Sequence, residues 1–326
     1  MSHPGSPVLS VVLAARNNWH YVRGCLHSLP EGGVPDYEVI VVDNASTDGT
    51  AQRVREKFPL ARIIQNETNT GHCHAMNQGI AASRGKYVLV LDGDTVLVPG
   101  AARRMVEFLE ARPDVAIVAP RMLNEDGSVQ ETARSFPTVM NGLWGRQSLL
   151  TAWFPNHPMS KKYLRRDALT ATEPFEVDWV SAAAMLFRRT LPEQIGYWDE
   201  TIRGYWVDAD WCKTAHQAGK IFCDPGSKVI HYEQNRKGIK KTTPRILLFH
   251  EGAYRFYSKH YTAGAMDPRA WFAGAALGAR ALLLIVADLF LKEAPDQKRP
   301  AAEEDTPKPL HARVQTEGAD TIDRVE

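Results

Sequence analysis

Two aspartates separated by one glycine follow a short apolar run in Leu89–Thr95, whose sequence is LVLDGDT. Because side chains alternate in an extended chain, Asp92 and Asp94 would point to the same side. Neighbouring carboxylates offer the hard oxygen ligands that Mg²⁺ or Mn²⁺ takes, with phosphate oxygens and waters completing the shell. An Asp-Gly pair is also an ordinary turn that closes a strand, so these residues by themselves leave both interpretations open.

A second polar cluster ends the apolar run of Val39–Thr50, VIVVDNASTDGT. A carboxylate at a strand end can accept a hydrogen bond from a nucleobase N–H or a ribose hydroxyl, and Asp43 is our candidate for that contact. Asn44, Ser46 and Asp48 can instead cap the helix that follows. We favour a cap for Asp48.

The third cluster, NTGHCHAMNQG, joins a strand to a helix just before the two-aspartate segment. Gly71 permits a close backbone approach, and a helix N-terminus there could face a nucleotide. His72 and His74 lack the i, i+4 spacing of a zinc pair, and the chain has no HExxH. We therefore interpret both histidines as solvated or packed side chains.

The fourth cluster is GYWVDADWC, in which Asp208 and Asp210 stand at the expected start of a helix. Negative charge is favoured at a helix N-terminus, so capping alone would explain them. The aromatic neighbours Tyr205, Trp206 and Trp211 could also form a platform for a sugar and raise the pKa of a nearby carboxylate by desolvation. The second interpretation gives a general base.

The elements around these clusters alternate in the manner of βαβ units. Strands are expected at Leu9–Ala14, Glu38–Asp43, Arg62–Gln65, Tyr87–Leu91 and Ala116–Ala119, and helices at Thr50–Phe58, His72–Ser83 and Ala101–Ala111. The expected strands are rich in Val, Ile and Leu, which indicates that both faces of the sheet are buried. We therefore predict an open, mostly parallel α/β sheet, whose strand ends carry the first three clusters.

Beyond Pro120 the pattern becomes irregular, and Pro120–Phe175 is expected to form long loops. Regular structure is expected again at Trp179–Arg188, Ala209–Ala218 and Lys228–His231.

Trp271–Leu291 is strongly apolar, with only Arg280 and Asp288 as charges. It is long enough to span a bilayer, but Arg280 near its centre would cost roughly 2.5–3.5 kcal/mol. We predict a helix docked on a membrane surface, with the basic run Arg236–Arg245 upstream. The alternative is a helix packed on the catalytic domain or on a second subunit.

Composition excludes several classes of protein. The net charge of +1 over 326 residues gives no global attraction to nucleic acid. The four cysteines form no CxxC pair, which argues against a zinc ribbon or a disulfide framework and favours a reducing cytoplasm. The start, Met1–Pro7, lacks the charged and apolar regions of a secretion signal. No GxGxxG follows the first strand and no GxxxxGK[ST] occurs, which disfavours a dinucleotide-dependent oxidoreductase and a P-loop NTPase.

Taken in chain order, these segments resemble family 2 of the glycosyltransferases, which has the GT-A fold, and most closely its bacterial rhamnosyltransferase-like members. The similar segments are SVVLAARNN from Ser10, VDNASTDGT from Val42, NTG from Asn69, LDGDT from Leu91, VDWVSAAAML from Val177, VDADWC from Val207 and VIHY from Val229. The resemblance covers about residues 8 to 260.

The resemblance implies roles for individual residues. Asp92, Asp94 and His231 would hold a Mg²⁺ or Mn²⁺ ion, and Asp208 or Asp210 would be the catalytic base. Val207 stands where family members often carry Glu, and Asp208 keeps the aligned carboxylate, so Asp208 is favoured and Asp210 is the alternate. The residues expected to bind the donor are Ala15, Asn17, Asp43, Asn44, Asn69, Gly71, Asn77, Asp92 and Gly93.

The implied reaction is the inverting transfer of a sugar, with rhamnose as a guess, from a UDP- or dTDP-linked donor to an acceptor hydroxyl. The acceptor would be a glycan or a lipid-linked glycan made for the cell surface, and the enzyme would work in the cytoplasm at the inner face of the plasma membrane. A homodimer is left open. The rivals are a metal-dependent sugar nucleotidyltransferase and an inactive glycan-binding relative.

The implied domains are a GT-A catalytic domain at 1–262, an apolar or amphipathic helical segment at 263–293 and a disordered polar tail at 294–326. The catalytic domain would bind the nucleotide sugar with residues 8–120 and the acceptor with residues 121–262.

Overall fold

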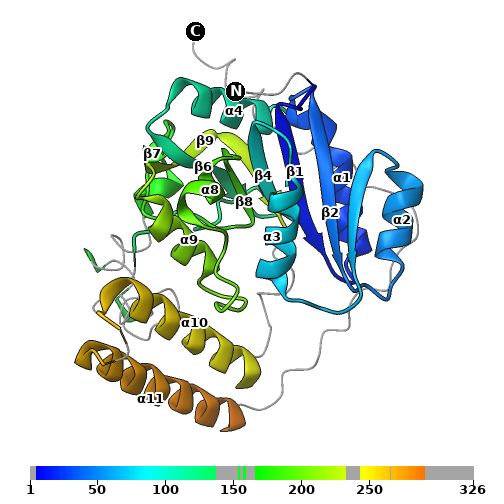
Figure 1. Cartoon of the computed structure of the whole chain (residues 1–326). Coiled ribbons are helices and arrows are strands. Elements are labelled where there is room, and N and C mark those ends of the chain that lie inside the picture. The colour runs from blue at the N-terminus through cyan, green and yellow to red at the C-terminus, as the bar shows by residue number, and fades with distance from the viewer. Residues whose placement is uncertain are drawn as a thin grey trace.

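A computed structural model describes residues 5–136, 153–154, 157–158, 166–232, 243–264 and 266–290. The predicted tail, most of the basic run Arg236–Arg245 and much of the predicted loop stretch lie outside these ranges. Within them, one sheet is flanked by helices on both faces (Figure 1).

The strands are β1 Leu9–Ala15, β2 Tyr37–Asn44, β3 Ala61–Asn66, β4 Tyr87–Asp92, β5 Thr95–Leu97, β6 Val115–Leu123, β7 Phe175–Glu176, β8 Ala184–Arg188 and β9 Lys220–His231. The α-helices are α1 Trp19–Ser28, α2 Thr50–Lys57, α3 His72–Ala82, α4 Ala101–Ala111, α8 Leu191–Ile195, α9 Val207–Ala215, α10 Thr243–Tyr261 and α11 Pro268–Phe290, with 3₁₀ turns η1 at Leu29–Gly32 and η2 at Arg166–Leu169.

The sheet has the order β3-β2-β1-β4-β8-β6-β9-β5, and β7 pairs with β9. Strands β1 to β4 are parallel to one another, as the sequence predicts. Strand β8 runs antiparallel between β4 and β6, and β5 and β7 run antiparallel to β9, so the sheet as a whole is mixed. In register, Ala15 lies opposite Asp43 and Ala14 lies opposite Asp92. The ends of β1, β2 and β4 therefore meet at one edge of the sheet.

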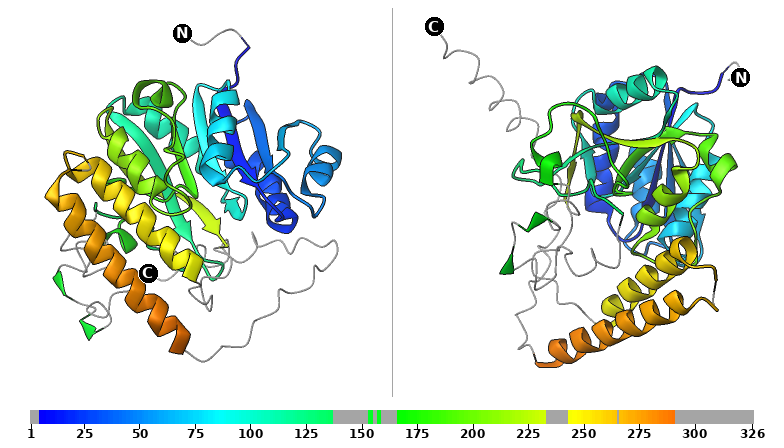
Figure 2. Two further views of the ribbon diagram at one scale, coloured as in Figure 1. Left: turned by 60° about the horizontal axis from the view of Figure 1, so that its bottom comes forward. Right: turned by 90° about the vertical axis from the view of Figure 1, so that its left-hand side faces the viewer.

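The alternation of buried residues along β1 builds two cores. Val12 packs with side chains of α3 and α9 on one face. Val11 and Leu13 pack with side chains of α1 and α4 on the other face. Figure 2 shows these helices on opposite sides of the sheet. The result is a three-layer α/β/α domain, the architecture that buries a sheet on both faces.

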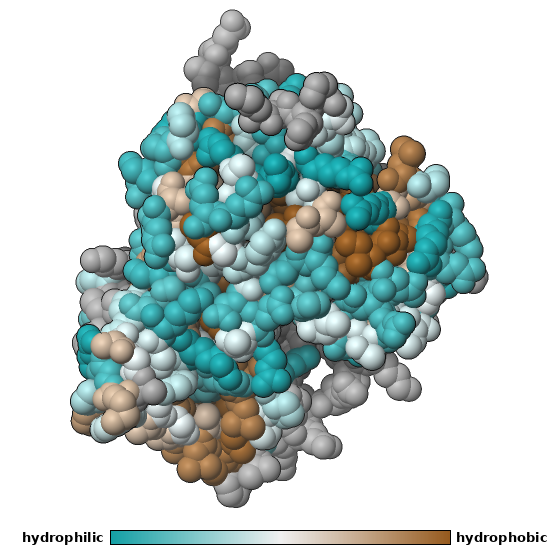
Figure 3. Space-filling view, viewed as in Figure 1, coloured by the Kyte–Doolittle hydropathy of each residue, from teal (hydrophilic) through white to brown (hydrophobic). Residues whose placement is uncertain are grey.

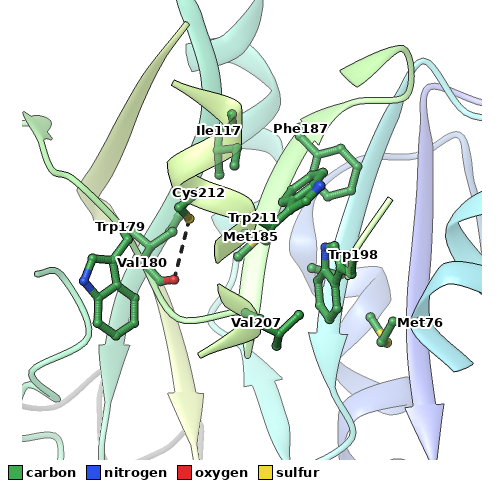
Figure 4. Packing of buried hydrophobic residues seen from close by; sticks show 14 of the residues in the cluster. Met76, Ile117, Trp179, Val180, Met185, Phe187, Trp198, Val207, Trp211 and Cys212 are labelled. Atoms are coloured by element: carbon green, nitrogen blue, oxygen red, sulfur yellow. Dashed lines mark hydrogen bonds between the residues drawn. The ribbon is translucent and has the colours of Figure 1, made fainter. Parts of the chain in front are cut away.

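Aromatic rings fill the first core beneath the acidic cluster of α9. Trp211 of α9 packs edge-on against Phe187 of β8, with ring centroids 4.8 Å apart, and Trp198 lies 6.2 Å from the same indole (Figure 4). The indole N–H of Trp211 donates to the carbonyl of Gly196. This packing fixes α9, and with it the position of Asp208, on the sheet.

A glycine allows α3 to lie close to the sheet. A Cβ on Gly79 would stand 2.3 Å from Cγ1 of Val12, a distance that no packed side chain tolerates. The absence of a side chain at this position lets the helix lie directly on β1. The N-terminus of α3 thereby reaches the edge where β4 ends.

Helices α10 and α11 pack on each other as a hairpin, which lies outside the sheet domain in both Figure 1 and Figure 2. The predicted boundary at residue 262 falls in the turn between them. The predicted helical segment 263–293 contains α11, while α10 was not expected from the sequence. Between the two helices, a guanidinium nitrogen of Arg280 lies 2.7 Å from Nε2 of His250.

Candidate active site

The three predicted metal ligands come together at the end of β4. One ligand atom from each of Asp92, Asp94 and His231 lies within 4.8 Å of the other two. The short strand β5 brings them together, because it pairs with β9 so that Thr95 lies opposite His231. The Tyr232 N–H also donates to the Asp94 carbonyl at 2.9 Å.

Gln130 fixes the imidazole of His231. The amide nitrogen of Gln130 donates to the carbonyls of His231, at 2.8 Å, and of the Asn124 side chain, at 2.9 Å. Its amide oxygen therefore faces Nδ1 of His231, 3.1 Å away, and Nδ1 must carry the proton. In the neutral imidazole the lone pair is then on Nε2, which lies 3.5 Å from Oδ1 of Asp94. This is the tautomer and orientation of a metal-binding histidine.

The glycine between the two aspartates has no room for a side chain. A Cβ on Gly93 would lie 2.9 Å from Nδ2 of Asn18 and 2.9 Å from Cγ2 of Val22. The turn therefore lies directly against the start of α1. Two carboxylates and one imidazole lone pair held in this way suit a hard divalent ion with remaining positions for phosphate oxygens and water.

Asp43 lies at the end of β2, and one of its carboxylate oxygens accepts no hydrogen bond from the described residues. Its side chain is 0% exposed, Oδ2 accepts from the Ser46 N–H at 3.2 Å, and Oδ1 has no hydrogen-bond partner within the structure. Buried carboxylate oxygens are rarely left in this state, because desolvation without a partner is costly. A donor from a bound molecule, such as a nucleobase N–H, would satisfy it.

The neighbouring predicted residues shape the strand-end loops. Asn17, at a φ of 51°, accepts from the Thr47 N–H at 2.7 Å and links the ends of β1 and β2. Asn44 is buried, donates to Asn69 Oδ1 and to the Gly71 carbonyl, and accepts from Thr70. Asn44, Asn69 and Gly71 are thus held to one another, and Ala15 is buried beside Asp43.

Asn77 points elsewhere. Its amide nitrogen donates to the Trp198 carbonyl and to Glu200 Oε1, both at 2.9 Å, and its oxygen accepts from the Trp198 N–H. The structure therefore uses Asn77 to join α3 to the segment before α9. Its contact with the donor stays a prediction.

His72 is a site residue that the sequence interpretation missed. It is the first residue of α3, and its Nε2 lies 3.8 Å from Oδ1 of Asp92. His74, in contrast, pairs with Glu200 at 2.9 Å and faces away from this site. The position of His72 directly after Gly71, at a helix N-terminus beside the two-aspartate turn, is the signal that could have revealed it.

The two aspartates of α9 have different surroundings. Asp210 is 1% exposed, and its oxygens lie 2.8 Å from Lys259 Nζ and 2.7 Å from His260 Nε2, both on α10. Asp208 is partly exposed, and its Oδ1 accepts from the Ala209 N–H at 2.9 Å. Asp210 thus anchors α10 on α9, whereas Asp208 as a residue is half-buried.

The surroundings of Asp208 suit a proton acceptor. Burial among protein groups raises the pKa of Asp208, while the Ala209 N–H and the positive charge of Arg134 act in the opposite direction. A carboxyl with a raised pKa accepts a proton more readily than an ordinary aspartate. Arg134 was not singled out in the sequence, because its approach depends on the bridge that it makes with Trp179.

One backbone segment joins Asp208 to the metal-ligand cluster. The Asp92 N–H donates to the Ala183 carbonyl at 2.9 Å. The backbone of Ala182, the preceding residue, is near enough to the Asp208 carboxyl to act against the rise in its pKa. The candidate base and the candidate metal ligands therefore lie beside adjacent residues of one segment.

Comparison with known proteins places this geometry in a family. The family described as glycosyl transferase family 2 matches residues 10–178, which is more than half of the chain. The chain is a family 2 glycosyltransferase. The matched region includes Asp43, Asp92 and Asp94, and the predicted resemblance is confirmed.

Two relatives are similar to this glycosyltransferase over longer stretches than the family match. An N-acetylglucosaminyl-diphospho-decaprenol L-rhamnosyltransferase of Mycobacterium tuberculosis is 26% identical over 294 residues, which cover 86% of this chain and 94% of that protein. A poly-beta-1,6-N-acetyl-D-glucosamine synthase of Staphylococcus epidermidis is 26% identical over 198 residues, covering 59% of this chain and 42% of that protein.

The solved structure of a mannosyltransferase from Pyrobaculum calidifontis, in complex with GDP-Man and Mn²⁺, has the same fold. Its TM-score is 0.53 at 20% identity, with 98% of this chain and 82% of that chain covered. The likeness confirms the predicted GT-A fold of the glycosyltransferase.

The geometry of Asp210 in this glycosyltransferase leads to a stability prediction. Asp210→Asn removes a buried charge and leaves Lys259 and His260 without their shared partner. We expect the free energy of unfolding to fall by about 1–3 kcal/mol, as for a buried partner removed from a polar cluster. Lys259 keeps its second contact, with Asp199 at 2.9 Å, which limits the loss. Denaturant unfolding measures the change, and kcat is expected to fall by less than about tenfold. A much larger loss of kcat at unchanged stability would make Asp210 the base.

Proposed function

We propose that this glycosyltransferase moves a sugar, with inversion, from a nucleoside-diphosphate donor to a hydroxyl of a lipid-linked glycan in cell-surface glycan synthesis. The observation that carries the proposal is the convergence, at one sheet edge, of Asp92, Asp94 and His231 with the unmet buried oxygen of Asp43. The L-rhamnosyltransferase activity of the mycobacterial relative favours rhamnose as the sugar. We propose a dTDP- or UDP-linked donor for it.

Each residue has a defined task in this proposal. Asp43 accepts a hydrogen bond from the nucleobase through Oδ1. Asp92, Asp94 and His231 would hold Mg²⁺ or Mn²⁺, which supplies positive charge to neutralise the departing diphosphate. His72 lies beside Asp92 and can donate a hydrogen bond towards the same phosphates.

Asp208 acts on the acceptor. Its carboxylate removes the proton from the attacking hydroxyl as that oxygen bonds to the anomeric carbon and the bond to the diphosphate breaks. Direct displacement by the acceptor reverses the anomeric configuration. Asp210 is assigned no role with substrate, since both of its oxygens are held by α10.

The proposed compartment is the cytoplasm at the inner face of the plasma membrane. All four cysteines are buried and free, which suits a reducing compartment. Nucleotide sugars are donors that a cytoplasmic enzyme would meet, and a lipid-linked acceptor would hold the second substrate at the membrane.

The nucleotide site can be tested without any sugar or acceptor. Asp43→Ala should weaken the binding of dTDP or UDP by about 10- to 10²-fold, because a hydrogen bond to a charged group contributes about 1.5–3 kcal/mol. Titration calorimetry of both nucleotides measures this loss. Asp114→Ala is the matched control, since Asp114 is an exposed aspartate that pairs with Arg112. Equal nucleotide affinity in the Asp43 variant and the control would remove Asp43 from the site.

A further inference from the structure

Helix α11 presents an apolar face whose large side chains are mostly exposed. Its large side chains on this face are Trp271, Phe272, Leu282, Leu283 and Val286, with Phe272 78% and Leu283 70% exposed. At about 3.6 residues per turn, these five positions lie on one side of the helix. Figure 3 shows apolar side chains gathered at the lower edge of the molecule, over this helix.

The opposite face of α11 is built for contact with α10. Ala270 and Ala281 are buried there, and a Cβ on Gly274 would lie 3.3 Å from the ring of Tyr254. Arg280, the charge near the middle of the helix, also turns inward, where Nε2 of His250 accepts its hydrogen bond. Nδ1 of His250 carries the proton, because it donates to the Ile246 carbonyl at 2.6 Å. The exposed face is therefore free of charged side chains from Ala270 to Ala287.

The sequence from residue 233 to the end of α11 is basic. It contains nine Lys or Arg and four Asp or Glu, a net charge of +5, whereas the whole chain carries only +1. Four of the nine basic residues lie at 236–241, outside the described part of the chain. The remainder of the chain is therefore acidic on balance. A positive region that carries an uncharged apolar face matches the surface of an anionic leaflet. A second copy of the chain would bring the same positive charge to that face and would be repelled.

We propose that the exposed face of α11 docks this enzyme on an anionic lipid surface, with the helix lying in the plane of the interface. Helix α11 is long and apolar enough to cross a bilayer, with a mean hydropathy of 1.8 over Pro268–Asp288. A crossing would separate it from α10 and carry Arg280 into hydrocarbon. Lying flat keeps the Arg280–His250 contact and buries only the apolar face.

The hairpin also links this face to the reaction. Lys259 and His260 of α10 hold Asp210, which stands two residues from the proposed base, Asp208. Docking through α11 would therefore set α9 at a fixed position above the membrane. This part of the inference rests on the proposed function, in which the acceptor is attached to a lipid.

Vesicle binding tests the docking face. The full chain should co-sediment with vesicles containing phosphatidylglycerol more strongly than with pure phosphatidylcholine, and less strongly as salt is raised. The double variant Leu282→Glu, Leu283→Glu should bind at least about tenfold more weakly. Leu60→Glu is the matched control, because Leu60 is 96% exposed before β3 and lies outside the hairpin. Its vesicle binding should equal that of the wild-type enzyme.

A second measurement does not depend on how the charged variant folds. Brominated lipid should quench the tryptophan fluorescence of the wild-type enzyme, and Trp271→Phe should remove most of that quenching. Transfer to a soluble acceptor, measured without vesicles, should be the same in wild type and all three variants. Failure of transfer in the wild type would count against the proposed function and leave the docking result intact.

Three results would overturn the docking proposal. The first is vesicle binding that is equal for both lipids or unchanged in the double variant. The second is a lipid-free dimer that the double variant converts to a monomer, which would give the face to a second copy. The third is wild-type enzyme that resists carbonate and high salt and leaves the membrane only in detergent, which would indicate a spanning helix.

Discussion

Asp94→Ala is expected to lower the rate of sugar transfer by about 10²- to 10⁴-fold, because it removes a ligand of the metal ion. That ion would stabilise the charge of the departing diphosphate in the transition state by several kcal/mol. The fold should survive, since the Asp94 side chain is at the surface end of a strand turn and its backbone carbonyl still accepts from Tyr232. Asp92→Ala should be similar or milder.

Metal binding separates this explanation from a purely structural one. The wild-type enzyme should lose activity in EDTA and recover it with Mg²⁺ or Mn²⁺, and calorimetry should detect Mn²⁺ binding that Asp94→Ala weakens. Asp114→Ala, at an exposed aspartate that pairs with Arg112, is the control for a general effect of lost charge. Near-normal turnover of Asp94→Ala after EDTA treatment and metal restoration would contradict the metal role.

Asp208→Asn is expected to reduce kcat by about 10²-fold or more, the range for loss of a general base, with little change in the KM for the donor. The substitution keeps the shape of the side chain and can still accept from the Ala209 N–H, so the packing of α9 should persist. A split between kcat and KM distinguishes this from a general loss of structure.

The pH dependence follows from the direction of the pKa shift. A base works in its unprotonated form, and burial raises the pKa of Asp208 above that of an ordinary aspartate. The kcat of the wild-type enzyme should therefore fall as pH is lowered through this raised pKa, at a higher pH than an exposed aspartate would give. Asp208→Asn should remove that acidic limb. Loss of the limb in Asp210→Asn, with Asp208→Asn unaffected, would exchange the two roles.

The parallel half of the sheet could be predicted closely because its signal is local. Strands β1, β2 and β4 contain long runs of buried apolar residues, whereas β3 is a half-buried strand at the end of the sheet. The predicted limits of all four strands differ from the observed ones by at most one residue at either end. The polar residues at their ends had to meet once the strands were parallel. Asp43, Asp92 and Asp94 could therefore be assigned to one edge from the sequence alone.

The other half depends on contacts between distant residues. Strand β8 inserts antiparallel between β4 and β6, which no periodicity in Ala184–Arg188 reveals. Of the regular structure predicted at Trp179–Arg188, only the last part, Ala184–Arg188, forms a strand. Helix α9 begins at Val207, two residues earlier than predicted, because the packing of Trp211 and the positive φ of Trp206 set its start.

The roles of Asp210 and His231 show the same limit. The family resemblance favours Asp208 as the base, but the local sequence places both aspartates at the start of one helix. The contacts of Lys259 and His260 on α10 give the two carboxylates different surroundings. Gln130, which orients His231, lies 101 positions before it in the chain. Local patterns identify which residues can do chemistry, but tertiary contacts decide which of them are free to do it.

The stereochemistry of the product, followed by NMR, tests the central claim most directly. The wild-type enzyme would be incubated with dTDP-rhamnose, UDP-linked sugars or GDP-mannose and a lipid-linked acceptor analogue, with and without Mg²⁺ or Mn²⁺. Metal-dependent, inverting transfer requires that one nucleotide sugar is consumed only when the metal is present, and that the product carries the sugar in the anomeric configuration opposite to that of the donor. Transfer that persists in EDTA, or a product that retains the configuration of the donor, would contradict it.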